Sequence, residues 1–241
     1  MTIPTVHRLY EAITTTWPAG TTRQEAGWEI RDGAGGGKRV SAVTLAQKEL
    51  ADIDWIEATL TAQGQEHLFM IRDGDEVLDE ALATRGYKIT DPVTLYLCDT
   101  ARVRPASLPR AQSYSIWEPL HIMHEIWAMG GIQEPRIALM HRVQTPKTAL
   151  LARSGDTPAG VGFLALDGDI AMLHAVEVLP SFRRTGVAKK LMAQAAKWAE
   201  DHGARYMALM TTRDNTAANR LYSSLGMRPV GQYHYRIKDT A

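Results

Sequence analysis

The chain has 241 residues, of which 45% are hydrophobic, so it can bury a substantial core as one large domain or two small ones. Twenty-seven basic residues balance 27 acidic ones, which leaves no global field to favour a nucleic acid or an anionic membrane as a partner. Cys98 is the only cysteine, and the chain has neither an export-type N-terminus nor an apolar run of about eighteen residues, so we expect a cytoplasmic protein without a disulfide.

The first hundred residues predict alternating helices and strands. Apolar residues recur at helical spacing in some stretches and form β-branched runs in others, with glycine or proline at the boundaries. The expected elements, in chain order, are a helix within 1–17, strands at 27–30 and 39–45, a helix at 48–62, a strand at 67–71, a helix at 76–84 and a strand or strand pair at 88–98.

The glycine-rich stretch 33–37 resembles a phosphate-binding loop only superficially. A nucleotide P-loop has four residues between its glycines, continues with Lys-Ser/Thr and opens a helix. Here Lys38 is followed by Arg39 and a β-branched run. We therefore predict a flexible hairpin between the two flanking strands.

Residues 99–113 contain two prolines and three arginines with little apolar periodicity, as in a linker. We predict a linker at 101–112 between an N-terminal domain, 1–100, and a C-terminal domain, 113–241. The elements expected in the second domain are a strand at 114–117, helices at 120–129 and 136–143, strands at 149–153, 159–166 and 170–179, a helix from 185 or 186, and a strand, a helix and a last strand after residue 203.

The two halves of the chain repeat one pattern. A strand, a helix, a glycine and a further strand are expected after Gly64, and the same order follows Gly203. Gly64 and Gly86 are 22 residues apart, and Gly203 and Gly226 are 23 residues apart. This echo predicts two copies of one supersecondary plan.

The stretch 174–192 joins a strand, a basic turn and a helix. Pro180 ends the predicted strand because it has no N–H to donate. Arg183 and Arg184 precede Gly186, after which apolar residues recur at helical spacing. The first turn of a helix presents unpaired N–H groups and the positive end of the helix dipole, so this turn is a candidate anion site. A solvated surface turn is the alternative.

Arg183, Gly186 and Ala188 fit the pattern Arg/Gln-x-x-Gly-x-Gly/Ala, and in this setting the stretch resembles the GNAT superfamily of acyl-CoA-dependent N-acyltransferases. The resemblance implies an α/β GNAT fold, with a central mixed, mostly antiparallel sheet flanked by helices. It also implies acetyl-CoA as cosubstrate and no metal. The strand and turn residues that the resemblance assigns to CoA are Val176, Glu177, Val178, Arg183, Arg184, Thr185, Gly186, Val187 and Ala188.

A second motif of the same family follows at the expected distance. Asn215 is a candidate helix cap by residue type, and by resemblance it contacts the pantetheine arm of CoA. By resemblance, Tyr222 lies beside the CoA sulfur and also belongs to the cofactor site. The sequence departs from the family pattern at Arg184, where many members carry glycine, and at Met227, which replaces phenylalanine. The residues that match Asn-x-x-Ala-x-x-Leu-Tyr-x-x-Leu-Gly are Asn215, Ala218, Leu221, Tyr222, Leu225 and Gly226.

The N-terminal half carries neither the Arg-x-x-Gly-x-Ala turn nor the asparagine and tyrosine of the second motif. Some members of the superfamily contain two copies of the fold in tandem. The internal echo and this resemblance together imply a degenerate GNAT-like N-terminal domain. Such a domain would have lost cofactor binding and would serve as a scaffold or as one wall of the substrate cleft.

Amide formation needs a neutral amine, but an ammonium group of pKa about 10.4 leaves only about one molecule in a thousand neutral at pH 7. A base must therefore take a proton, and a positioned acid can assist the departure of the CoA thiolate. Tyr222 is the predicted acid. A packed aromatic side chain on an amphipathic helix is the alternative for this residue.

Glu177 is the predicted base because it interrupts an otherwise apolar strand, and apolar surroundings raise the pKa of a carboxyl group. His174 competes for this role, and a water chain is a third candidate. A period of two puts Glu177 on the face opposite His174 and Val176. A bulge, which is common in this strand of the family, would change that alternation.

His121, His124 and Glu125 lie close enough on one predicted helix to suggest a metal site. No further ligand with characteristic spacing accompanies them, and acyl transfer needs no metal, so we predict none. The favoured function is N-acetylation of a primary amine by direct attack. A non-catalytic acyl-CoA-binding regulatory protein and transfer of a longer acyl group are the alternatives, and the sequence leaves the acceptor and the oligomeric state open.

Overall fold

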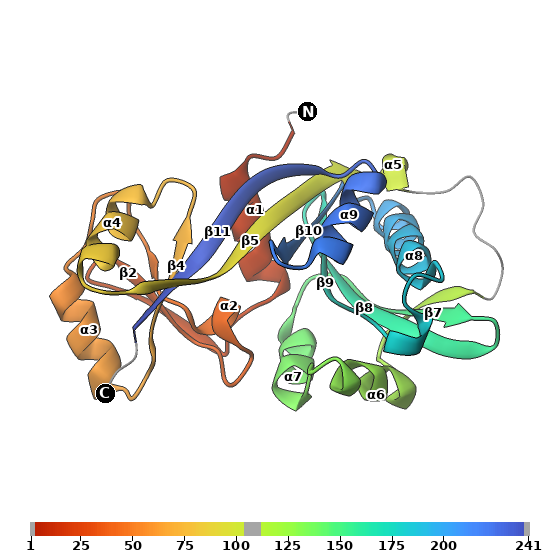
Figure 1. Ribbon diagram of the computed structural model, residues 1–241, viewed down its shortest axis with the longest axis horizontal. Helices are drawn as coiled ribbons and strands as arrows, with labels where there is room; N and C mark the ends of the chain where they lie inside the picture. Colours follow the sequence, from red (N-terminus) through yellow and green to blue (C-terminus); the bar gives the residue numbers. More distant parts are fainter. Residues whose placement is uncertain (1–2, 104–111, 239–241) are drawn as a thin grey trace. The chain divides into compact units, whose positions relative to one another are not determined.

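The computed structural model describes residues 3–103 and 112–238 (Figure 1). Its helices are α1 (Val6–Thr16), α2 (Lys38–Ser41), α3 (Ile53–Ala62), α4 (Glu76–Thr84), α5 (Thr100–Val103), α6 (His121–Met129), α7 (Glu134–Arg142), the 3-10 turn η1 (Pro180–Phe182), α8 (Val187–Asp201) and α9 (Thr216–Ser224). Its strands are β1 (Thr21–Glu25), β2 (Trp28–Asp32), β3 (Thr44–Leu45), β4 (His67–Arg72), β5 (Lys88–Asp99), β6 (Ser113–Ile116), β7 (Lys147–Ser154), β8 (Thr157–Asp167), β9 (Ile170–Val178), β10 (Tyr206–Thr212) and β11 (Arg228–Lys238). No helix in these two ranges is long and apolar enough to span a membrane.

The chain forms two compact units. Unit 1 holds the described residues 3–18, 95–103, 112–211 and 215–230. Unit 2 holds the described residues 19–94, 212–214 and 231–238. Strands β5 and β11 each contribute residues to both units.

Unit 1 is built on a mixed sheet. Its strands follow the order β5, β10, β9, β8, β7, β6. The pairs β6–β7, β7–β8 and β8–β9 are antiparallel, whereas β9–β10 is parallel. A hairpin turn joins β8 to β9, with Asp167 opposite Ile170. These features confirm the predicted fold class, an α/β fold with a mostly antiparallel sheet flanked by helices.

Helices cover both faces of this sheet. Helix α8 lies along β7, β8 and β9 (Figure 1), and Leu191 and Ala195 on its inner face are fully buried. Helices α1 and α6 pack against β8 and β9. Successive side chains of a strand point to opposite faces, so Leu164 joins the core with α8 while Phe163 contacts Trp17 beside α1.

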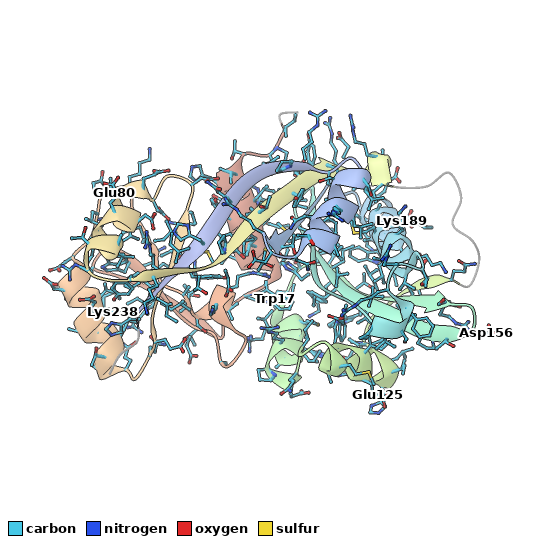
Figure 2. The ribbon with its side chains drawn as sticks, viewed as in Figure 1. Trp17, Glu80, Glu125, Asp156, Lys189 and Lys238 are labelled. Carbon is cyan, nitrogen blue, oxygen red and sulfur yellow. The ribbon has the colours of Figure 1, made fainter. Side chains whose placement is uncertain are left out.

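The N-terminal helix α1 is part of unit 1. Arg8 Nη1 lies 2.5 Å from Asp167 Oδ2, and Arg8 Nη2 donates to the Asp167 carbonyl. Trp17, labelled in Figure 2, stacks on His174 with ring centroids 4.9 Å apart. The helix buries one face, which includes Leu9, Ala12, Ile13 and Thr16.

Unit 2 has its own core. Strands β1, β2 and β3 form an antiparallel sheet, and β4 pairs antiparallel with β11, whose other neighbour is β5. A bridge between Val43 and Phe69 connects the segment before β3 to β4. Helices α3 and α4 contribute to the core through the fully buried side chains of Ile56, Leu78 and Leu82.

The predicted strand at 39–45 is wrong over most of its length. Lys38–Ser41 form helix α2, and only Thr44–Leu45 pair with β2. Side-chain contacts favour the helical turn over the β-propensity of this run: Val40 is buried, Lys38 Nζ lies 2.7 Å from Asp91 Oδ2, and Arg39 Nε donates to Tyr233 Oη. The glycine-rich stretch therefore opens a helix of four residues instead of forming a hairpin.

The helix predicted at 48–62 begins later than expected. Asp52 is its N-cap, and the Asp52 Oδ1 atom accepts hydrogen bonds from the backbone N–H groups of Asp54 and Trp55. The helix then runs to Ala62, and Gly64 follows with a φ of 63°. The stop signal predicted from the sequence is thus confirmed, and the start is set by the cap.

The predicted internal repeat has matching elements in the structure. Strand β4, helix α4 and β5 follow Gly64 in the same order as β10, α9 and β11 follow Gly203. Gly86 and Gly226, which close the two helices, have φ values of 85° and 78°. The interpretation of the N-terminal half as a degenerate GNAT-like domain stays a prediction.

The compact units do not follow the predicted division of the chain at 101–112. Helix α1 and the end of β5 pack in unit 1, where Tyr96 and Cys98 join the core. The end of β11 packs in unit 2, where Tyr235 lies opposite Met70 of β4. Neither unit is therefore contiguous in sequence. Most of the predicted linker, 104–111, lies outside the described residues.

A fragment of residues 113–241 is expected to lose the cooperative folding of unit 1, because it lacks α1 and the strand beside β10. Burying one large apolar side chain such as Leu9 or Ile13 contributes about 1.5–3 kcal/mol, and a whole domain is stable by only about 5–15 kcal/mol. Thermal unfolding followed by circular dichroism should show a cooperative transition for the full chain and none for the fragment. A fragment that melts cooperatively at the temperature of the full chain would contradict this account.

Candidate active site

Strand β9 contains a β-bulge at Ala175. The register pairs His174 with Phe163 and Glu177 with Val161, so two residues of β9 lie opposite the one residue between Phe163 and Val161. Ala175 has a φ of 50°, in the left-handed region that residues with a side chain rarely adopt. The bulge breaks the period of two. The bulge that the family resemblance raised as an alternative is therefore present, and the period of two that would place Glu177 and His174 on opposite faces does not hold. Their cross-strand partners Val161 and Phe163 are two residues apart and share a face, so Glu177 and His174 also share a face.

His174 is enclosed on the side of α1. It is 3% exposed, and its Nε2 atom lies 2.9 Å from Thr16 Oγ1. Thr16 Oγ1 already donates to the carbonyl of Ala12, so it accepts from His174 Nε2–H. The Trp17 ring stacks on the imidazole. These contacts favour a packing role for His174 over that of a base.

Glu177 lies at the rim of the same face. Its side chain is 18% exposed, and its Oε1 atom lies 3.4 Å from Arg183 Nη2. Arg183 also donates from Nε to the carbonyl of Val178 at 3.3 Å. The carboxylate of the candidate base is thus beside an arginine of the predicted cofactor turn.

Strands β9 and β10 part before they end. Their parallel register covers Ile170–Leu173 and Tyr206–Leu209. Both strands continue beyond these pairs, and no further pair joins them in the part of the chain that the structure describes. Val176 and Val178 pack their side chains against the core of unit 1. The backbone of the end of β9 is therefore the part that a pantetheine arm could pair with.

The predicted anion-binding turn lies between η1 and α8. Arg184 and Gly186 both have positive φ, 64° and 88°, and Gly186 is the N-cap of α8. No atom lies within 4 Å of the place a Cβ would take on Gly186, so the backbone is open to a bulky anion. Thr185 Oγ1 donates to the Phe182 carbonyl at 2.7 Å and closes the turn. The helix N-terminus and two exposed arginines give the turn a positive field.

Asn215 and Tyr222 lie on helix α9. Asn215 is its N-cap, with Oδ1 accepting from the Ala218 N–H at 3.1 Å, as its residue type predicted. Tyr222 is 6% exposed, and its ring lies 5.8 Å from that of Tyr96. Burial raises the pKa of Tyr222 to about 12, and Tyr96 adds to the shift. The phenol therefore keeps its proton throughout the physiological range.

Helix α6 contributes two residues that the sequence did not single out as part of the site. Trp127 is fully buried, and its Nε1 donates to the carbonyl of Ala175 at 2.8 Å. Gly130, at the end of α6, leaves the space in which Glu177 lies. In the sequence, Trp127 is an apolar position of a helix and Gly130 marks the end of that helix. Neither pattern predicts a contact with β9.

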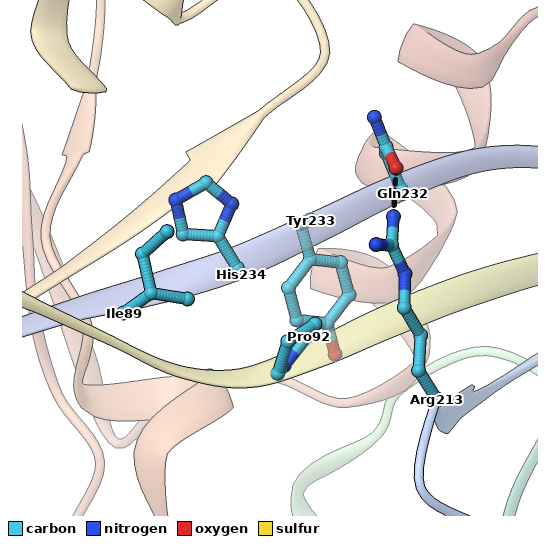
Figure 3. A pocket seen from close by; sticks show the side chains of 6 residues that line it. All are labelled: Ile89, Pro92, Arg213, Gln232, Tyr233 and His234. Carbon is cyan, nitrogen blue, oxygen red and sulfur yellow. Dashed lines mark hydrogen bonds between the residues drawn. The ribbon is translucent and has the colours of Figure 1, made fainter. Parts of the chain in front are cut away.

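Two surface pockets have linings that include none of the predicted site residues. One, of about 240 Å³, belongs to unit 2 (Figure 3), where Arg213 donates to Gln232. The other, of about 190 Å³, belongs to unit 1 and includes Tyr206 and Cys98. The first is lined by Ile89, Pro92, Arg213, Gln232, Tyr233 and His234, and the second by Ile3, Leu97, Cys98, Asp99, Arg102, Tyr206, Gly226, Arg228 and Val230.

The histidines of α6 do not form a metal centre in the structure. His121 is exposed, and its Nε2 lies 3.2 Å from Glu125 Oε1 on the same helix. Within residues 3–103 and 112–238, no group of three or more His, Cys, Asp or Glu side chains could hold a metal ion.

Known proteins resemble this chain in sequence and in fold. The family described as the acetyltransferase (GNAT) family matches residues 114–227. The uncharacterized N-acetyltransferase YobR of Bacillus subtilis is 25% identical over 244 residues, which cover 97% of this chain and 98% of that protein. An aminoglycoside N(6')-acetyltransferase type 1 of Salmonella typhimurium is 40% identical over 57 residues, 24% of this chain and 39% of that protein. A GCN5-related N-acetyltransferase from Kribbella flavida shares the fold, with a TM-score of 0.73, 16% identity, and coverage of 97% of this chain and 95% of that one.

Replacing Gly160 with alanine should destabilise unit 1. A Cβ there would lie 2.7 Å from Val187 Cγ1 and 3.0 Å from the Glu177 carbonyl, so β8, β9 and the start of α8 would have to shift. Such overpacking costs about 1–3 kcal/mol. Gly162→Ala is the matched control, because its Cβ would make only ordinary contacts at 3.6 Å or more. Urea unfolding measures both variants, and equal losses in the two would refute the packing argument.

Proposed function

We propose that this chain, which belongs to the GNAT acetyltransferase family through residues 114–227 and is an acyltransferase, transfers acetyl from acetyl-CoA to a primary amine. The transfer is a direct attack of the amine on the thioester within a ternary complex. The observation that carries the proposal is the combination of parted strands β9 and β10 with an open, positively charged helix start at Gly186.

The cofactor turn supports binding of the CoA pyrophosphate. Arg183 and Arg184 supply charge, and the first N–H groups of α8 supply donors with no partner inside the helix. Gly186 lets the phosphate groups reach these donors, because no neighbouring atom fills the space above it. The backbone of Val176 and Val178 would pair with the pantetheine arm, since their side chains are committed to the core.

Glu177 supports removal of the amine proton. Its carboxylate is partly exposed and lies on the side of the sheet that α6 covers, beside Arg183. An N–H bond of the ammonium breaks and an O–H bond forms on Glu177, directly or through one water. The neutral amine then attacks the thioester carbonyl, the C–S bond breaks, and the second proton lost from the nitrogen passes to the leaving thiolate to give the CoA thiol.

Tyr222 supports departure of the thiolate. Its pKa of about 12 is above the value of about 8.5 for a thiol, so complete transfer of the phenol proton to sulfur is uphill. A hydrogen bond from the phenol to the developing thiolate stabilises negative charge without that transfer. This role needs the phenol to be protonated, which its raised pKa ensures.

The acceptor is a primary amine of a small molecule or a protein. The name of the Salmonella relative gives an aminoglycoside as its acceptor, and that relative shares 57 residues with this chain. Aminoglycosides therefore belong in the set of amines to be tested, beside polyamines and peptides with a free lysine or N-terminus. Transfer of a longer acyl group is tested with the corresponding acyl-CoA.

Unit 2 carries no equivalent anion site at the start of its helix α3. Asp52 caps this helix with its own carboxylate, and Asp54 lies in the first turn. The Asp52 carboxylate accepts from the backbone N–H groups of Asp54 and Trp55, so it occupies donors that would bind a pyrophosphate, and its charge repels one. We therefore propose that the N-terminal half, as a degenerate relative of the catalytic domain, does not bind CoA and serves as a scaffold.

Tyr222→Phe should lower kcat by about 10- to 10⁴-fold, because it removes only the hydroxyl that stabilises the leaving sulfur. Acetyl-CoA affinity should stay within about twofold, since CoA is held mainly by the turn and the strand. Release of free CoA thiol over the amine panel measures kcat, and calorimetry measures affinity.

Tyr206→Phe is the control, because it removes a buried hydroxyl on β10 in another part of unit 1. Equal kcat in Tyr222→Phe and wild type would exclude Tyr222 from the reaction. Intact acetyl-CoA binding with no turnover on any amine would favour the non-catalytic binding protein.

A further inference from the structure

The last turn of helix α6 lies against the bulge of β9. Trp127 reaches β9 with its indole N–H, which donates to the Ala175 carbonyl at 2.8 Å. Ala175 is the residue with a φ of 50°, a conformation that persists only where the surroundings hold it. Trp127 is fully buried and Ala175 is half-buried, so this hydrogen bond lies at the edge of the core. The indole therefore holds the backbone at the position that turns Glu177 to the side of α6.

Gly130 lies one turn further along the same face of α6, since residues three apart are neighbours on a helix. A Cβ on Gly130 would lie 2.5 Å from Cγ, Cδ and Oε2 of Glu177. Gly130 has a φ of −86°, which any residue adopts, so its backbone does not require glycine. The requirement for glycine is steric, because the side chain of Glu177 occupies the volume that a side chain at position 130 would fill.

We propose that Trp127 and Gly130 are positioning residues for the Glu177 carboxylate. Trp127 fixes the backbone of β9 at the bulge from which the strand leads to Glu177. Gly130 has no side chain and so leaves the space that the Glu177 side chain occupies. Arg183 holds the other side of the carboxylate at 3.4 Å. This inference rests on the proposed function, in which Glu177 takes the proton from the acceptor amine.

Gly130→Ala is the direct test. The three atoms nearest to the added methyl group all belong to the flexible side chain of Glu177, so we expect the carboxylate to be displaced while the fold is kept. We expect a melting temperature equal to or slightly above that of wild type, because alanine restricts the unfolded chain more than glycine. We expect kcat to fall by roughly 10- to 100-fold, as for a misplacement of about 1 Å in a catalytic group. Acetyl-CoA affinity should change by less than about twofold.

A double-mutant cycle with Glu177→Gln separates positioning from a general structural effect. If Gly130 acts through Glu177, adding Gly130→Ala to Glu177→Gln lowers kcat no further. Gly162→Ala, which adds a methyl group on β8 in ordinary contact, should keep kcat.

Trp127→Phe tests the second contact, since it removes the indole N–H and keeps an aromatic ring. It should lower kcat and leave acetyl-CoA affinity within about twofold. Unchanged kcat in Gly130→Ala, or losses that add in the double variant, overturn this inference alone. Wild-type protein that turns over no amine overturns the proposed function, and the inference falls with it.

Discussion

The bulge at Ala175 is the constraint on which the rest of unit 1 depends. One extra residue in β9 turns His174 and Glu177 to the same face, His174 into the packing beside α1 and Glu177 to the rim beside Arg183. The valines that follow the bulge join the core, which leaves the backbone beyond the end of the β9–β10 ladder free to pair with a ligand. The indole N–H of Trp127 donates a hydrogen bond to the carbonyl of Ala175, the residue at the bulge.

Each compact unit is completed by a strand from the other half of the chain. The end of β5 takes the place beside β10 in unit 1, and the end of β11 takes the place beside β4 in unit 2. The N-terminal helix α1 is also part of unit 1, anchored by Arg8 on Asp167. Folding of unit 1 therefore depends on residues that lie far outside the segment 114–227 that carries the family match.

Sequence patterns predicted the elements whose structure depends on residues close together in the chain. Periodicity predicted α6, α8, α9 and the strands of the sheet of unit 1, and residue type predicted the Asn215 cap and the helix start at Gly186. Features decided by distant contacts were missed. The β-branched residues of 39–45 predict a strand. In the structure, Lys38 forms an ion pair with β5 and Arg39 a hydrogen bond with β11, and these contacts favour a helical turn. The bulge could not be derived from a period of two, and the contacts of Trp127 and Gly130 with β9 have no signature in α6 itself.

The central claim is that the turn before α8 binds the pyrophosphate of CoA. Calorimetric titration of acetyl-CoA into wild type and Gly186→Glu tests it most directly. Gly203→Glu is the matched control, because Gly203 has a φ of 84°, has no atom within 4 Å of its Cβ position, and lies at the other end of α8. The account predicts a Kd in the micromolar range, about −8 kcal/mol, for wild type and Gly203→Glu, and no binding for Gly186→Glu. Folded wild-type protein that does not bind acetyl-CoA, or equal binding in all three proteins, would contradict it.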